Sequence, residues 1–156
     1  MGNAIAFSAE RLTTINTIDL LTKVTKSVVI HGFEFVEALK HTLKQCFVMG
    51  RHTGLVHITP DSATKYAWAH KDRQPWGTPS PLQCPSCGIL NCWTSVYENA
   101  GDDLKSYTME CMNKKCSYQG SRRVGDPFSF HAVLPEGSTT LGKPKDDGVW
   151  LKIPAN

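Results

Sequence analysis

The chain has 156 residues, of which 40% are hydrophobic and 9% aromatic, enough to bury a core in one domain or in one domain with an appended module. Its formal net charge of +3 is too small to predict a polyanionic partner by itself. No apolar run reaches the ~18 residues of a membrane-spanning helix, and the N-terminal residues lack the basic and apolar regions of a secretory signal. We therefore expect an intracellular protein, cytoplasmic or nuclear, with no membrane partner.

The N-terminal third begins with a helical pattern. Apolar residues at three-residue steps between Leu12 and Leu21 predict a helix from Arg11 to Lys26, although several β-branched threonines weaken its propensity. The short β-branched run that follows predicts a buried strand over Lys26–Ile30, ended by Gly32.

A clearer amphipathic pattern comes next. One apolar stripe predicts a helix from Phe33 to Met49, with Gly50 at its C-terminal cap. Gly54–Thr59 reads as a second strand and Tyr66–Ala69 as a third. Strand, helix and strand in this order predict a βαβ unit, in which the two strands pair in parallel.

The second half opens with Gln74–Pro81, where three prolines and a glycine predict a linker or an extended segment. Cys92–Tyr97 and Ser106–Glu110 then read as two strands joined by a turn. The last residues are rich in glycine, proline and charge, except for Val149–Ile153, which we expect to dock as an edge strand.

Four of the six cysteines form two close pairs, Cys84 with Cys87 and Cys111 with Cys116. Four thiolates in two pairs are what a closed tetrahedral zinc site requires, and this donor set leaves no open position for a catalytic water. We therefore predict a structural Zn²⁺ at these residues. A reducing compartment also favours a bound metal over disulfide bonds as the cross-link that stabilises the fold.

Alternative ligands remain open at this stage. Cys87 and Cys92 have the same spacing as Cys111 and Cys116, so Cys92 can replace Cys84, and His131 can substitute for one thiolate. Disulfide pairing is a further alternative. The set with Cys84 is preferred because the proline and glycine of Cys84-Pro85-Ser86-Cys87-Gly88 belong to that turn.

The segment Cys84–Gly120, with its Cys-Pro-x-Cys-Gly turn and its strand, turn and strand before Cys116, resembles zinc ribbons, including those of transcription factors and transposase-type proteins. The resemblance covers about a quarter of the chain. It implies a small β-hairpin module with a structural metal, often in contact with nucleic acid or protein, and it implies no catalysis.

These patterns together predict a fold and a domain organisation. The fold is α/β with a small sheet, followed by a zinc-ribbon hairpin module and an extended C-terminal tail. The predicted segments are an α/β region at 1–73, a proline-rich linker at 74–83, the ribbon at 84–134 and the tail at 135–156.

Four basic residues surround the second cysteine pair: Lys114, Lys115, Arg122 and Arg123. Lysine and arginine can neutralise phosphates, and the nearby tyrosines can stack on bases. The principal functional hypothesis is therefore a non-enzymatic, zinc-stabilised module that binds DNA or RNA through this basic loop.

Two other classes of function remain. In the first, zinc only braces a surface that meets another protein chain or a second copy of this one. In the second, the protein is a metal-dependent nuclease whose acid, base or metal-binding groups come from the α/β region. That set is His31, Glu37, His41, His57 and Asp61. No recognised catalytic motif joins these residues.

Overall fold

The computed structural model describes residues 2–9, 14–71, 73–100, 104–119, 122–123, 129–143 and 148–155. It divides into two compact units: Met1–Ala69 with Pro135–Asn156, and His70–Leu134. We call them the first and second units and describe each by itself. The predicted helix start at Arg11 and part of the turn between the two later strands lie outside the described residues.

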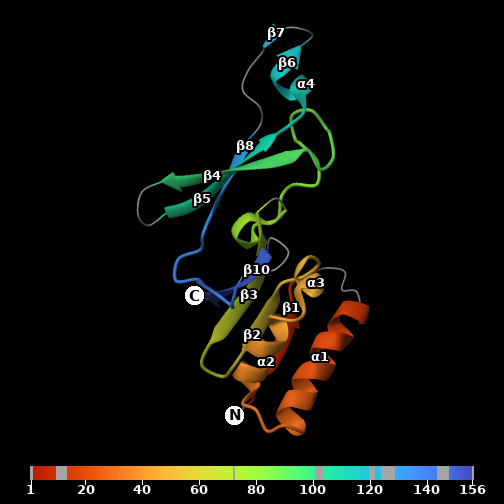
Figure 1. Cartoon of the computed structure of the whole chain (residues 1–156), viewed down its shortest axis with the longest axis vertical. Helices are drawn as coiled ribbons and strands as arrows, with labels where there is room; N and C mark the ends of the chain where they lie inside the picture. Colours follow the sequence, from red (N-terminus) through yellow and green to blue (C-terminus); the bar gives the residue numbers. More distant parts are fainter. Residues whose placement is uncertain are drawn as a thin grey trace. The chain divides into compact units, whose positions relative to one another are not determined.

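The first unit contains a five-stranded sheet with the order β1-β2-β3-β10-β9 (Figure 1). The strands are β1 (Ala4–Phe7), β2 (Leu55–Ile58), β3 (Ala63–His70), β9 (Thr139–Thr140) and β10 (Gly148–Ala155). β2 pairs antiparallel with both β1 and β3. Along β2, Leu55 and His57 are buried while Ile58 is exposed, which is the two-residue alternation of a strand with one face on a core.

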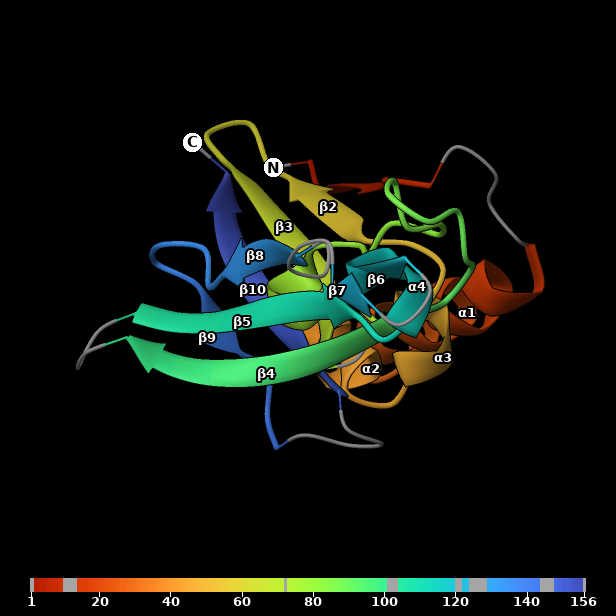
Figure 2. The same ribbon diagram turned by 90° about the horizontal axis from the view of Figure 1, so that it is seen from above.

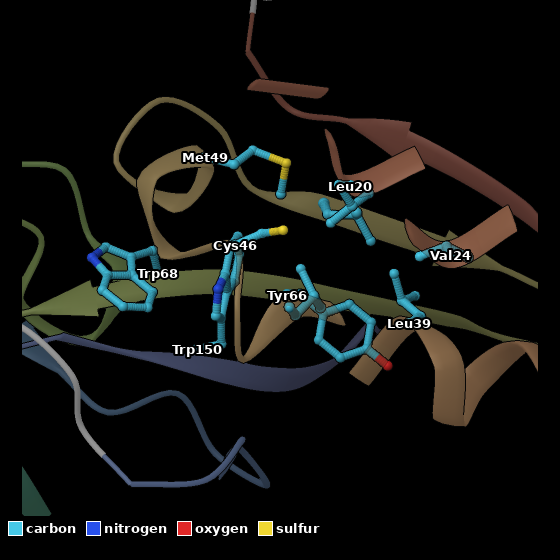
Figure 3. Packing of buried hydrophobic residues seen from close by; sticks show 10 residues of the cluster. Leu20, Val24, Leu39, Cys46, Met49, Tyr66, Trp68 and Trp150 are labelled. Carbon is cyan, nitrogen blue, oxygen red and sulfur yellow. The ribbon is translucent and has the colours of Figure 1, made fainter. Parts of the chain in front are cut away.

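Three helices of the first unit, α1 (Thr14–Val29), α2 (Phe35–Leu43) and the single-turn α3 (Phe47–Gly50), contribute to one core with this sheet (Figures 1 and 3). The core residues come from every one of these helices and from β2, β3 and β10. They are Leu20, Val24, Leu39, Leu43, Cys46, Met49, Leu55, Tyr66, Trp68 and Trp150. In the part of the chain that the structure describes, no helix combines the length and apolar character needed to cross a bilayer.

The strand predicted over Lys26–Ile30 is wrong, because α1 continues to Val29. Ile30 still donates its backbone N–H to Lys26 O at 2.9 Å, and Gly32, at φ +68°, follows the helix end. Once a helix has formed, each further residue adds a hydrogen bond without a new nucleation cost. The β-branched run is also largely exposed, with Val29 74% exposed, so it gains none of the burial that a central strand needs.

The helix predicted over Phe33–Met49 is interrupted after Leu43, and α3 begins only at Phe47. Cys46, at φ −103° and ψ 51°, leaves helical geometry there. Its side chain nevertheless stays in the core, and burial raises the pKa of its thiol to about 11. Cys46 is therefore a protonated core residue, as its place on the apolar stripe indicates.

The predicted parallel βαβ unit is also wrong. On one side, β2 pairs with β1, a strand that the sequence patterns missed. This pairing is antiparallel. Nor do residues 135–156 form an extended tail, since they supply β9 and β10 to this sheet. β10 contains the predicted strand Val149–Ile153 but lies between β3 and β9, because Trp150 and Leu151 are fully buried apolar residues that an edge position would expose.

The second unit contains a three-stranded sheet with the order β4-β5-β8, visible in Figure 2 as two long neighbouring strands with β8 beside β5. Its elements are the 3₁₀ turn η1 (Pro75–Gly77), β4 (Trp93–Ala100), β5 (Leu104–Cys111), α4 (Lys114–Ser117), β6 (Tyr118–Gln119), β7 (Arg122–Arg123) and β8 (Ser129–Val133). Both strands predicted between the cysteine pairs are confirmed, and they pair antiparallel from Trp93 with Cys111 to Ala100 with Leu104.

Candidate metal centre

Four cysteine side chains of the second unit meet in one cluster: Cys84, Cys87, Cys111 and Cys116. Their sulfur atoms all lie within 4.8 Å of one another. Cys84 and Cys87 come from the loop before β4, Cys111 ends β5, and Cys116 lies in α4. Among the residues that the structure describes, no other cysteine, histidine or carboxylate group gathers in this way.

The sulfur spacing fits a tetrahedral metal. Cys84 Sγ lies 3.8 Å from Cys116 Sγ, and Cys87 Sγ lies 3.7 Å from Cys111 Sγ. A metal held about 2.3 Å from each sulfur in a tetrahedron would separate the sulfurs by about 3.8 Å. A disulfide, in contrast, would need about 2.05 Å. The geometry therefore matches four-thiolate coordination of one ion.

The first cysteine pair sits on a tight turn. Gly88 donates its backbone N–H to Cys84 O at 2.9 Å, and Cys84 N–H donates to Ile89 O at 2.9 Å. Gly88 has φ +74°, a conformation that residues with a Cβ rarely adopt. The Gln83 side chain also donates to Gly88 O at 2.8 Å. These contacts explain locally why the Cys-Pro-x-Cys-Gly sequence directs two sulfurs to one point.

The second pair is positioned by the hairpin. Cys111 lies opposite Trp93 in the β4–β5 register, and the next residue, Met112, donates its N–H to Cys92 O at 2.7 Å. Cys116 then donates its N–H to Asn113 O at 2.8 Å. The wider four-residue spacing is accommodated by the short helix α4.

The cysteine pKa values shift in opposite directions. Burial is the main influence on Cys84 and Cys111, and it raises the pKa of both thiols. The Asn113 side chain and then the Ile89 backbone lower the pKa of Cys87 to about 6. Since metal ligands must be thiolates, a bound dication would supply the positive charge that the buried sulfurs otherwise lack. Asn113 was not singled out by sequence, and its place between Cys111 and Cys116 was the only available signal.

An apolar shell surrounds the sulfurs. Cys84, Cys92 and Cys111 share a buried cluster with Trp93 and Met109. The Trp93 ring meets Phe130 of β8 edge to face, with centroids 5.2 Å apart, and its Nε1–H donates to Pro81 O at 2.6 Å. This packing ties the loop before β4 to the sheet, so the hairpin and the cysteine cluster form one structural unit.

The rival ligands lie outside the four-cysteine group. Cys92 Sγ is 3.3 Å from Cys111 Sγ, yet it is not a member of the group in which every sulfur is within 4.8 Å of the rest. It donates instead to Ile89 O at 3.5 Å. His131 is on β8, with Nδ1 3.0 Å from Thr108 Oγ1. Cys92 therefore lies next to the four-cysteine group, beside Cys111.

The four basic residues lie along one short stretch after Cys111. Lys114 is exposed at the start of α4. Arg122 and Arg123 form β7, which pairs with Gln119 and Tyr118 of β6. The side chains of Lys115, Arg122 and Arg123 lie outside what the structure describes, so only their backbone placement is available.

The residues of the nuclease hypothesis do not converge in the described part of the first unit. Glu37 pairs with Lys40 Nζ at 2.7 Å, and His41 Nε2 lies 2.9 Å from Gln45 Nε2. His57 is buried beside Phe35 and bonds to Asn3 Oδ1 at 2.8 Å, and burial lowers its pKa. These side chains have separate local partners.

Comparisons of this chain with protein-family models, with curated proteins and with solved structures find no match. The four-cysteine cluster must therefore be interpreted from its own geometry and chemistry.

Proposed function

We propose that the second unit is a zinc-ribbon module that holds one structural Zn²⁺ through Cys84, Cys87, Cys111 and Cys116. The observation that carries the proposal is the convergence of the four sulfurs at distances suited to a tetrahedral ion. Zinc is the natural occupant of a four-thiolate tetrahedral site in the absence of redox chemistry. With every coordination position filled by sulfur, the ion would stabilise the fold and activate no water.

We further propose that this module binds nucleic acid through Lys114, Lys115, Arg122 and Arg123. Support comes from their position, since Lys114 and Lys115 lie on α4, which also contains Cys116, and Arg122 and Arg123 form β7 shortly after it. A metal that fixes Cys111 and Cys116 would anchor the start of this segment. Basic side chains presented from an anchored loop can follow a phosphate backbone.

Replacing these four residues with glutamine should weaken binding to DNA or RNA and flatten its salt dependence. With one phosphate contact each, the wild-type slope of log K against log salt on duplex DNA would be about −3.6, and the variant should lose most of it. Fluorescence anisotropy on a labelled oligonucleotide between 50 and 200 mM salt measures both quantities, while zinc content should stay unchanged.

A variant that removes the same charge elsewhere is the matched control. Lys26, Lys44, Arg51 and Lys65 are exposed residues of the first unit, and their replacement should leave the slope as it is. Equal losses in both variants would indicate a general charge effect and contradict a site on the second unit. A wild-type chain without measurable affinity at 50 mM salt would refute the nucleic-acid proposal.

A protein-assembly role is the second candidate, and one specific observation favours it. Ile15, Ile18 and Leu21 lie at three-residue steps on α1 and are 76%, 57% and 41% exposed. Large apolar side chains grouped on one helix face are often covered by a partner. In this case, zinc would only brace the second unit, and the contact surface would be on α1.

Light scattering distinguishes this candidate. If α1 mediates self-assembly, the wild-type chain should have the mass of a dimer or larger oligomer, and the I15E/I18E variant should be monomeric because it buries charge at the contact. The control V133E places the same charge on a 46% exposed residue of β8 in the second unit and should not change the mass. A monomeric wild type at all concentrations contradicts self-assembly.

A further inference from the structure

The second unit holds a fifth cysteine in contact with the metal cluster. Cys92 Sγ lies 3.3 Å from Cys111 Sγ, closer than the 3.7 Å between Cys87 Sγ and Cys111 Sγ. Two thiolates that share one zinc stay about 3.8 Å apart, because each of their bonds to the metal is about 2.3 Å long. Cys92 is therefore the neighbour that approaches Cys111 most closely, although it does not belong to the four-cysteine group.

The backbone explains why the Cys92 side chain reaches Cys111. Cys92 directly precedes Trp93, the first residue of β4, which lies opposite Cys111 in the β4–β5 register. In a regular strand, side chains alternate between the two faces, so the residue before Trp93 would point away from Cys111. Asn91, at φ +49°, redirects the chain immediately before Cys92. The regular alternation begins only at Trp93, and the Cys92 sulfur is left beside that of Cys111.

The two sulfurs lie at the inner side of a cluster whose other side is open to solvent. Cys92 and Cys111 are each 5% exposed, whereas Cys87 and Cys116 are half-buried. A bulky disulfide reagent would not enter such a site, but hydrogen peroxide is little larger than water. Besides Cys111, Cys92 Sγ contacts Ile89 O at 3.5 Å, a weak interaction that leaves the side chain able to move.

We propose that Cys92 and Cys111 form a reversible disulfide in response to peroxide and that this bond releases the metal. The proposal rests on the structural zinc proposed above. Shortening the sulfur–sulfur distance from 3.3 Å to the about 2.05 Å of a disulfide requires an approach of about 1.25 Å. Cys92 can make this movement because no metal holds it, whereas each ligand sulfur would be held by the zinc.

The reaction takes two steps, with a peroxide as the oxidant. The Cys111 thiolate attacks one peroxide oxygen and the O–O bond breaks. A proton from solvent completes one water, and Cys111 carries a sulfenic acid. The Cys92 sulfur then attacks the Cys111 sulfur, the S–O bond breaks, and the hydroxide leaves as a second water with the Cys92 thiol proton. The two sulfurs lose two electrons and the peroxide gains two. With only three thiolates left, the zinc dissociates.

Treatment of the whole, zinc-loaded chain with hydrogen peroxide tests the proposal. After free thiols have been blocked, peptide mass spectrometry should find a disulfide between Cys92 and Cys111. A chromogenic zinc indicator should register the release of one zinc per chain. Reductant and added zinc should then restore the metal, because a disulfide is reduced by thiols and a sulfinic acid is not.

The variant C92S removes the thiol that resolves the sulfenic acid and keeps all four ligands. Its Cys111 should be oxidised further to a sulfinic acid, so that reduction should restore less than about half of its zinc. The matched control C46S removes the other cysteine outside the group. Cys46 lies in the core of the first unit, 6% exposed, with its Sγ 3.4 Å from Asp19 Oδ2. C46S should therefore behave as the wild type.

Three outcomes contradict the proposal in different ways. A disulfide between Cys87 and Cys111 in the wild type, or full recovery of zinc by C92S, would overturn the role of Cys92. Zinc that is retained under peroxide with no linked cysteines would refute the switch and leave the structural zinc intact. A chain that holds no zinc before treatment would contradict the zinc proposal, and the release of metal with it.

Discussion

Replacing Cys84 with serine should release the metal and unfold residues 84–134, whereas replacing Cys92 with serine should leave one zinc per chain. Structural zinc sites supply about 10–16 kcal/mol of apparent binding energy, and much of that energy is folding energy. Loss of a residue that only hydrogen-bonds to a metal ligand lowers metal affinity by about 10–100-fold. Loss of a thiolate ligand itself should therefore lower metal affinity by more than about 100-fold. Metal analysis and the amide NMR signals of the second unit measure the two effects.

The Cys92 variant is the matched control, because Cys92 Sγ lies only 3.3 Å from Cys111 Sγ but outside the four-sulfur group. Retention of zinc by C84S together with its loss from C92S would establish the alternative set of ligands. A folded wild-type chain that was never exposed to chelator and contains no zinc would contradict the site altogether.

A large loss of stability in the first unit is expected for Leu39→Ala. Leu39 is fully buried on α2, in the core formed with α1 and the sheet. Removing its side chain leaves a cavity, so the free energy of unfolding should fall by about 2–5 kcal/mol. Ile15→Ala, at a residue that is 76% exposed, should change it by less than about 0.5 kcal/mol.

Chemical denaturation measures this difference, provided that the first unit is followed separately. The indole NMR signals of Trp68 and Trp150 report on it alone, because both residues lie in its core. A similar loss of stability in the two variants would mean that α1 is covered in solution or that α2 is not packed as described.

The clustering of the four cysteines could be predicted from sequence because its determinants are local. The Cys84 turn needs one glycine at positive φ and two hydrogen bonds between residues at most five apart. The two strands between the pairs were equally readable, because a run of turn residues separates them in the sequence. What could not be read was which strands of the first unit would be neighbours. β1 has only four residues, and β3 pairs with β10 across a long stretch of chain.

The break between α2 and α3 was hidden for a different reason. No glycine or proline marks Cys46, whose non-helical geometry keeps it in the core with Met49. Tertiary packing determines the backbone conformation at such a residue, and local helix propensity does not predict it. The exposed end of α1 was misread in the same way, since a β-branched run carries a strand signal even when nothing covers it.

The position of β10 beside β3 has a consequence for synthesis of the protein. The ribosome makes β1, β2 and β3 first, then all of residues 70–134, and only afterwards Trp150, which fills the core of the first sheet. A nascent chain that has reached residue 116 already carries all four cysteines of the cluster. With β8 at Ser129–Val133, all strands of the second unit are synthesised before β10, so the first unit is the last of the two to receive all of its strands.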